Sequence, residues 1–218
     1  MSFRILRSSG FWALTVILAL AAGSILLLHY RDIKKQNVVA LLPANDDGVR
    51  QLVAKTFGDS VVLAGDAPQY VSGDFNGDGS EDIAVLVRPA GGKLEKVNGP
   101  DANWIIRDPH KVFLPGPKQR VITLEANPKP EKVEANDVLI AMIHGVGQEG
   151  WRGPLTQQIF LLRNVAESSP VTEHPPQLPW QPQRSAVIRE TAEHAPGYIY
   201  WVGTMYAWHS LNSNIAKK

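Results

Sequence analysis

An uncharged apolar run near the N-terminus limits most strongly what this chain can fold into. Residues 8–30 carry no formal charge, and Leu, Ala, Ile and Val dominate residues 11–28. At about 1.5 Å of rise per residue, a helix of this length crosses a hydrocarbon core of roughly 30 Å. Phe11, Trp12 and Tyr30 stand near its ends, where aromatic rings favour the membrane interface. The run predicts one transmembrane helix within an anchor segment, residues 1–36.

A cleaved signal peptide is the alternative interpretation of the same run. Arg4 and Arg7 form a basic start, and Ala19-Leu20-Ala21 resembles a small-residue cleavage site. Cleavage there would leave an apolar stub on the mature chain, so the sequence favours an uncleaved anchor. Basic residues flank both ends of the run, so their charge alone leaves its orientation open.

Charge and cysteine content exclude several functions for the remainder, residues 37–218. The whole chain has a net charge of +1, but the anchor segment holds five basic residues and one acidic residue, which leaves the remainder mildly acidic. A surface that tracks phosphates needs clustered Lys and Arg, so no nucleic-acid partner is expected. The chain has no cysteine, which excludes disulfides, thiolate metal sites, a cysteine nucleophile and a lipoprotein anchor.

One helix is expected at the start of this remainder. Val49, Leu52, Val53 and Phe57 recur at helical spacing, capping residues precede them, and Gly58 follows as a stop. The pattern predicts a short amphipathic helix whose apolar stripe packs on a sheet.

Short β-type runs separated by Gly, Pro, Asn and Asp follow this helix. They predict a single α+β domain, mainly antiparallel β sheet with one short packed helix, preceded by the transmembrane helix. Gly203-Thr204 separates the last two runs, which are expected to form a hairpin with facing aromatic residues. The predicted strands are 61–64, 70–73, 83–87, 103–107, 121–125, 138–144, 158–163, 186–190, 198–202 and 205–209.

A proline-rich segment, residues 169–184, interrupts the series of strands. Its five prolines remove backbone donors that a helix or a central strand requires. The composition predicts an extended surface loop.

Chemistry is concentrated in the loop 74–82. Asp74, Asp78, Glu81 and Asp82 lie within nine positions that contain no basic residue. Without a cation these carboxylates repel one another, and a divalent ion would remove that cost.

Oxygen donors at alternating positions followed by glycine indicate which ion the loop takes. Calcium accepts six to eight oxygens at flexible geometry, which suits this spacing. The expected ligands are the side chains of Asp74, Asn76, Asp78 and Asp82 with the carbonyl of Ser80, while Glu81 points to solvent. An EF-hand is excluded because Val85 occupies the twelfth position, where that motif needs a bidentate Glu.

Residues 70–85, which include Asp-Phe-Asn-Gly-Asp-Gly, resemble the calcium loop of FG-GAP/VCBS-type repeats. The resemblance implies a loop between two antiparallel strands, calcium as a structural clamp, and a protein exposed outside the cytoplasm. It covers only about residues 70–87 and occurs once, whereas propellers repeat the unit several times, so a closed propeller is not expected.

The function expected from these features is a membrane-anchored, calcium-binding domain with a non-catalytic binding or scaffolding role. Its N-terminus would be cytoplasmic and its domain periplasmic or extracellular, or secreted after cleavage, because such sites need calcium levels absent from cytosol. A partner protein or a cell-envelope component would be its target. Two alternatives stay open. One is a hydrolase of envelope polymers that uses the Gly-rich segment His144 to Glu149, and the other is an accessory subunit of a membrane complex.

Overall fold

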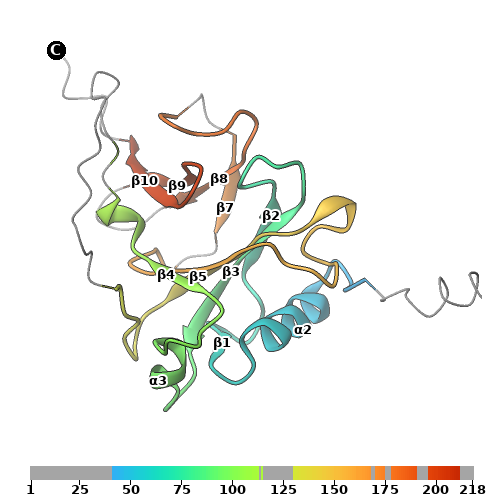
Figure 1. The fold of residues 1–218 in the computed structure, drawn as a ribbon, viewed down its shortest axis with the longest axis vertical. Coiled ribbons are helices and arrows are strands. Elements are labelled where there is room, and N and C mark those ends of the chain that lie inside the picture. Colours follow the sequence, from blue (N-terminus) through green and yellow to red (C-terminus); the bar gives the residue numbers. More distant parts are fainter. Residues whose placement is uncertain are drawn as a thin grey trace, which may run out of the picture. The chain divides into compact units, whose positions relative to one another are not determined.

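The computed structural model describes residues 41–112, 114, 130–167, 170–174, 178–190 and 196–211. These residues form a mostly β protein with two sheets and few helices (Figure 1), which confirms the β-rich expectation. The predicted anchor and the strand expected at 121–125 lie outside the described residues. Within the described part, no helix has both the length and the apolar character that crossing a membrane requires.

The first sheet has the strand order β1-β3-β5-β6-β4, with β2 also paired to β3. All of its pairs are antiparallel except β4 with β6. Its strands are β1 (Val61–Leu63), β2 (Tyr70–Gly73), β3 (Asp82–Pro89), β4 (Ile105–Arg107), β5 (Leu139–Ile143) and β6 (Ile159–Leu162).

The second sheet is fully antiparallel with the order β10-β9-β8-β7. Its strands are β7 (Val171–Glu173), β8 (Val187–Glu190), β9 (Gly197–Trp201) and β10 (Tyr206–Ser210). The helical elements of the described residues are α2 (Asp46–Phe57), α3 (Leu94–Val97), and the 3₁₀ turns η1 (Pro109–Lys111) and η2 (Gly147–Glu149).

Helix α2 forms where the sequence predicts it. The Asn45 side chain accepts a hydrogen bond from the Gly48 N–H at 3.1 Å, and Gly58 ends the helix with φ 59°. Its buried stripe, which includes Leu52 and Phe57, packs on one face of the first sheet. The predicted amphipathic helix on a sheet is thereby confirmed.

Strand β3 is buried on both faces, which explains its continuous apolar sequence. Ile83, Val85 and Val87 belong to the core beneath α2. Ala84 and Leu86 instead join the core that includes Ile188 and other second-sheet residues. The first sheet is therefore the middle layer between α2 and the second sheet (Figure 1).

Three features differ from the sequence predictions. A second short helix, α3, packs Val97 into the core beneath α2, where the sequence predicts only one helix. The strands form two sheets rather than one, because β8, β9 and β10 bury an apolar face against the first sheet instead of extending it. The segment 169–184, expected to be a loop throughout, contains β7, which pairs only with β8. An edge strand of three residues tolerates nearby prolines because it needs ladder donors on one side only.

In addition to the core that they share, the two sheets are joined at two places along their margins. Strand β2 lies beside β7, and η1 lies beside β10. The first margin carries the predicted calcium loop, since that loop continues β2. The second carries a separate polar cluster around His110, which is described further below.

Candidate metal site

The predicted calcium loop connects β2 to β3, two antiparallel strands, as the family resemblance implies. Gly77 and Gly79 adopt left-handed φ values of 79° and 86°, which glycine tolerates without strain. A Cβ atom at Gly77 would also lie 2.8 Å from Pro182 Cβ. The end of the proline-rich segment therefore packs directly against the loop. Just beyond it, the Ala186 N–H donates to the Asp74 carbonyl at 2.7 Å.

Asp74 organises the loop through its side chain. Its Oδ1 accepts hydrogen bonds from the N–H groups of Gly77 (2.7 Å) and Asp78 (3.1 Å), and its Oδ2 accepts from Gly79 (2.9 Å). Asp78 in turn accepts from the Ser80 N–H at 2.8 Å. The backbone consequently wraps around two carboxylates, and Asp78 is exposed to solvent.

Asp82 fastens the loop from below and is completely buried. Its Oδ2 accepts from the N–H groups of Phe75 (2.9 Å) and Asn76 (3.3 Å), and its Oδ1 accepts from Gly145 (2.9 Å). Burial raises the pKa of Asp82 to about 7, although the three backbone N–H groups act in the opposite direction. A positive charge beside this carboxylate would favour its ionised form.

The turn after β5 is the surface on which the loop rests. A Cβ atom at Gly145 would lie 2.2 Å from the Glu81 carbonyl oxygen, and one at Gly150 would lie 2.6 Å from it, so only glycine allows this approach. The same carbonyl accepts the Trp151 N–H at 2.8 Å, and the Ser80 hydroxyl accepts the Gly147 N–H at 3.0 Å. The two segments that the sequence marked separately are therefore one structural unit.

His144, at the start of this turn, links the loop to the second sheet. Its side chain is 1% exposed and packs among the rings of Phe160 and Trp201. Its Nε2 lies 2.6 Å from Tyr206 Oη, and its Nδ1 lies 3.4 Å from Asn76 Nδ2. Burial lowers the pKa of His144 to about 4, so the ring is neutral at neutral pH.

The hydrogen bonds fix the tautomer of this ring. Asn76 Oδ1 accepts the Asp78 N–H at 3.0 Å, which turns the Nδ2 group of Asn76 toward His144. Because an amide nitrogen only donates, His144 Nδ1 accepts and the ring proton is on Nε2. His144 then donates to Tyr206, so a chain of contacts runs from the loop to β10.

Glu149 is not part of this arrangement. It is exposed on η2, whereas His144 is buried, and no hydrogen bond or ion pair between them occurs in the described residues. A buried imidazole whose two nitrogens already face Tyr206 and Asn76 is poorly placed to serve as a general base for a polymer in solvent. The structure therefore does not bring together the two residues named for the hydrolase alternative.

The loop offers only hard oxygen donors, as calcium requires. The expected ligands Asp74, Asn76, Asp78, Ser80 and Asp82 all lie within it, and Glu81 is exposed and accepts a hydrogen bond from Ser72. Across the described ranges, no group of three or more Asp, Glu or His side chains is arranged to hold a metal ion by carboxylates and imidazoles alone. A calcium ion here would also depend on the Asn76 amide and the Ser80 carbonyl.

Sequence reasoning missed two contributors to this site. Tyr206 was recognised only as a hairpin aromatic, and no local signal connects it to a loop more than 120 positions earlier. Gly145 belongs to a glycine cluster that the sequence did mark, but its role against Glu81 depends on the tertiary contact. Comparison with family models, curated proteins and solved structures gives no match for the chain.

Proposed function

We propose that this protein is a membrane-anchored, extracytoplasmic calcium-binding domain with a non-catalytic binding or scaffolding role. The observation that carries the proposal is the loop 74–82, which wraps its backbone around Asp74 and presents oxygen donors without a basic residue. Calcium would act as a clamp between β2 and β3, in the manner implied by FG-GAP/VCBS-type loops. The apolar run at residues 8–30 supplies the anchor.

Two further observations support a scaffold rather than a catalyst. His144 is buried with both ring nitrogens facing protein groups, and the turn beneath the loop is held by backbone hydrogen bonds. Leu155 and Trp180 are large apolar residues that stay 64% and 56% exposed. Large apolar side chains that are exposed in this way suit contact with a partner protein or an envelope component.

Calcium binding is tested with the full chain in detergent, by titration calorimetry and by thermal melts with calcium or chelator. Binding to the native state alone raises the melting midpoint in a concentration-dependent way. Asp78→Asn removes one ligand charge, yet it keeps an oxygen for the Ser80 N–H. We expect it to weaken calcium binding at least about tenfold, because ligand charge sets the affinity of such loops.

Glu81→Gln is the matched control, since it neutralises an exposed carboxylate of the same loop that is not an expected ligand. Its affinity should stay within about threefold of the wild type. Absence of binding heat and of any midpoint shift would refute the calcium site. Equal losses in the two variants would show that only net charge matters and would refute the assigned ligands.

Membrane anchoring and sidedness need a separate test. In cells whose outer envelope has been permeabilised while the cytoplasmic membrane stays intact, added protease should digest residues 37–218. In a separate sample without protease, the chain should stay with the membrane fraction after alkaline extraction. Release by alkali would contradict the anchor, and protection from protease would contradict the extracytoplasmic location.

A further inference from the structure

The second margin between the sheets contains a buried carboxylate oxygen without a hydrogen bond. Glu190, at the end of β8, is 2% exposed, and its Oε1 accepts the Ala166 N–H at 2.8 Å. Its Oε2 has no hydrogen-bond partner among the described residues. The nearest positively chargeable group is His110 of η1, whose Nε2 lies 3.5 Å from that oxygen. This separation allows an ion pair but is long for a hydrogen bond.

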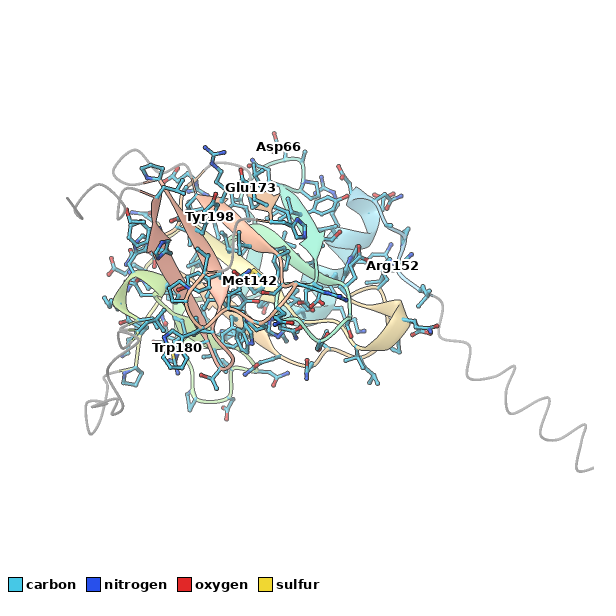
Figure 2. The ribbon with its side chains drawn as sticks, turned by 90° about the horizontal axis from the view of Figure 1, so that it is seen from above. Asp66, Met142, Arg152, Glu173, Trp180 and Tyr198 are labelled. Carbon is cyan, nitrogen blue, oxygen red and sulfur yellow. The ribbon has the colours of Figure 1, made fainter. Side chains whose placement is uncertain are left out.

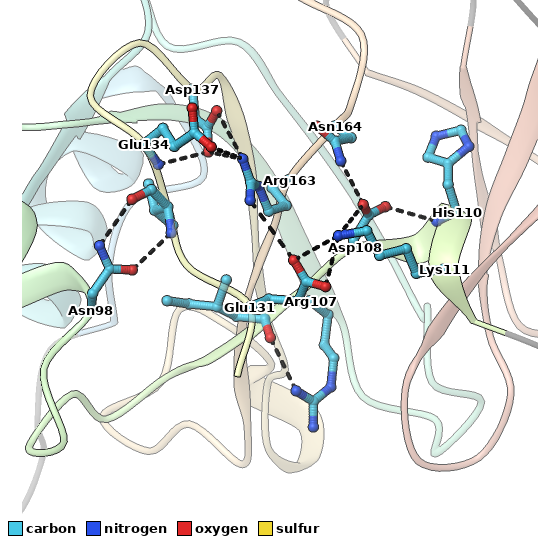
Figure 3. Close-up of polar contacts among 12 residues, drawn as sticks. Asn98, Arg107, Asp108, His110, Lys111, Glu131, Glu134, Asp137, Arg163 and Asn164 are labelled. Carbon is cyan, nitrogen blue, oxygen red and sulfur yellow. Dashed lines mark hydrogen bonds and ion pairs between the residues drawn. The ribbon is translucent and has the colours of Figure 1, made fainter. Parts of the chain in front are cut away.

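His110 is held in place by contacts from both sheets. Its ring packs on Trp208 of β10 with centroids 4.6 Å apart. Its backbone N–H donates to Asp108 at 3.0 Å, and Asp108 also accepts from Asn164, which follows β6 (Figure 3). The imidazole therefore joins η1, which continues the first sheet, to two strands of the second.

The segment that His110 fastens covers an apolar surface. We call residues 108–112 and 114 the strap. Val112 and Leu114 pack on the cluster formed by Leu178, Val187, Tyr200 and Ala207. None of these four belongs to the core between the sheets. Val187, Tyr200 and Ala207 lie on β8, β9 and β10 and form the outer face of the second sheet, and Leu178, which precedes β8, packs on them.

We propose that protonated His110 latches the strap across the margin of the two sheets and that loss of this proton loosens the strap and uncovers the outer face. An unpaired carboxylate oxygen in a buried position is costly, and a cationic imidazole beside it offsets that cost. A neutral imidazole leaves the ion pair unmade. The latch is thus a proton-dependent contact at the margin opposite the predicted calcium loop, and it does not depend on calcium binding.

The negatively charged groups around His110 all raise its pKa. The Glu190 carboxylate raises the pKa of His110 above its ordinary value, and Asp108 and the Asn164 carbonyl act in the same sense, whereas burial lowers it. Lys111 on the same turn pairs with Glu131 at 2.9 Å, and its Nζ also lies 3.6 Å from Asp108 Oδ2. Because the pKa of His110 is higher when the strap is held than when it is released, protonation stabilises the held strap. This stabilisation is complete at pH values below the pKa of the released state, and it is lost as the pH rises through the pKa of the held state.

Hydrogen exchange of the full chain in detergent tests the latch. Protection of strap peptides, corrected for the intrinsic pH dependence of exchange, is compared at pH values of about 5.5 and 8. We expect at least about fivefold more protection at the lower pH in the wild type, and no such difference in His110→Gln or Glu190→Gln. Peptides from α2 report that each variant is folded.

His174→Gln is the control, because His174 is an exposed histidine that follows β7. It should keep the wild-type pH difference. Should Glu190→Gln fail to fold, titration of the His110 ring by NMR replaces it, with a midpoint above that of free histidine expected. Equal strap protection at both pH values, or a pH difference that persists in His110→Gln, would overturn the proposal.

Discussion

Asp82 Oδ1 and the Gly145 N–H form a buried hydrogen bond of 2.9 Å, which ties the loop after β2 to the turn after β5. The other oxygen of Asp82 holds the start of the loop through Phe75 and Asn76. One side chain therefore sets the position of the predicted calcium ligands relative to the middle sheet. A site with such support can stay ordered before an ion arrives, which reduces the entropy cost of binding.

Asp82→Asn tests this support. An amide NH₂ group cannot accept, so at least one of the three backbone N–H groups would lose its partner inside the protein. We expect the free energy of unfolding to fall by about 2 kcal/mol or more, measured by urea denaturation without calcium. Glu81→Gln at the neighbouring exposed position should cost less than about 0.5 kcal/mol. A loss below about 1 kcal/mol for Asp82→Asn would contradict the role of Asp82 in holding the loop.

Gly145→Ala tests the close approach of the turn to the loop. Its Cβ atom would stand 2.2 Å from the Glu81 carbonyl oxygen, so one backbone segment must move. We expect a loss of about 2 kcal/mol or more in unfolding free energy, together with weaker calcium binding. Gly91→Ala is the control because a Cβ atom there meets nothing within 4 Å. Similar stabilities of the two variants would show that the contact is not maintained.

Replacing each of two tyrosines of the second sheet by Phe should have opposite effects on stability. Tyr206 Oη is bonded to the buried His144, whereas Tyr200 Oη is buried without a hydrogen bond in the described residues. Tyr206→Phe leaves the His144 donor unpaired and should cost about 1–3 kcal/mol. Tyr200→Phe removes an unsatisfied hydroxyl and should be neutral or stabilising. Thermal melts rank the variants, and an equal loss in both would contradict the His144 contact.

Arg163 and Arg189 compare an enclosed ion-pair cluster with an exposed pair. The Arg163 side chain is 13% exposed and reaches Asp137 at 3.1 Å and Glu134 at 3.3 Å (Figure 3), whereas the side chain of Arg189 is 45% exposed. Arg163→Gln should cost about 1–2 kcal/mol and increase hydrogen exchange at 131–137, because it removes the charged partner of Asp137, whose side chain is only 17% exposed. Arg189→Gln should cost less than about 0.5 kcal/mol. Equal losses of unfolding free energy in the two variants would show that the Arg163 cluster contributes no more than an exposed ion pair.

Local sequence was sufficient for several parts of the fold. The bounds of α2 follow from Asn45 and Gly58, which act on their own neighbours. The C-terminal hairpin also follows from adjacent residues, and Trp201 opposes Tyr206 in its register, with ring centroids 5.1 Å apart. Figure 2 shows Trp180 at the periphery, whereas Met142 lies in the interior, and both positions agree with their exposure.

The residues of the candidate site were also identified from the sequence, because all five expected ligands lie within nine consecutive positions. The spacing of Asp74, Asn76 and Asp78 encodes a turn that these side chains stabilise locally, because each accepts a hydrogen bond from a backbone N–H within the loop. By contrast, the short strand β7 was missed, since its pairing with β8 overrides a proline-rich context.

Sequence alone therefore determined the apolar run, the helix, most strands and the oxygen donors of the loop, because each depends on contacts between near neighbours. Only the tertiary structure decided that the strands divide into two sheets, that Asp82 meets Gly145, and that His110 faces Glu190. These relationships join residues 63 and 80 positions apart. They arise when two apolar faces are buried together, and no local periodicity specifies which polar groups are then enclosed between them.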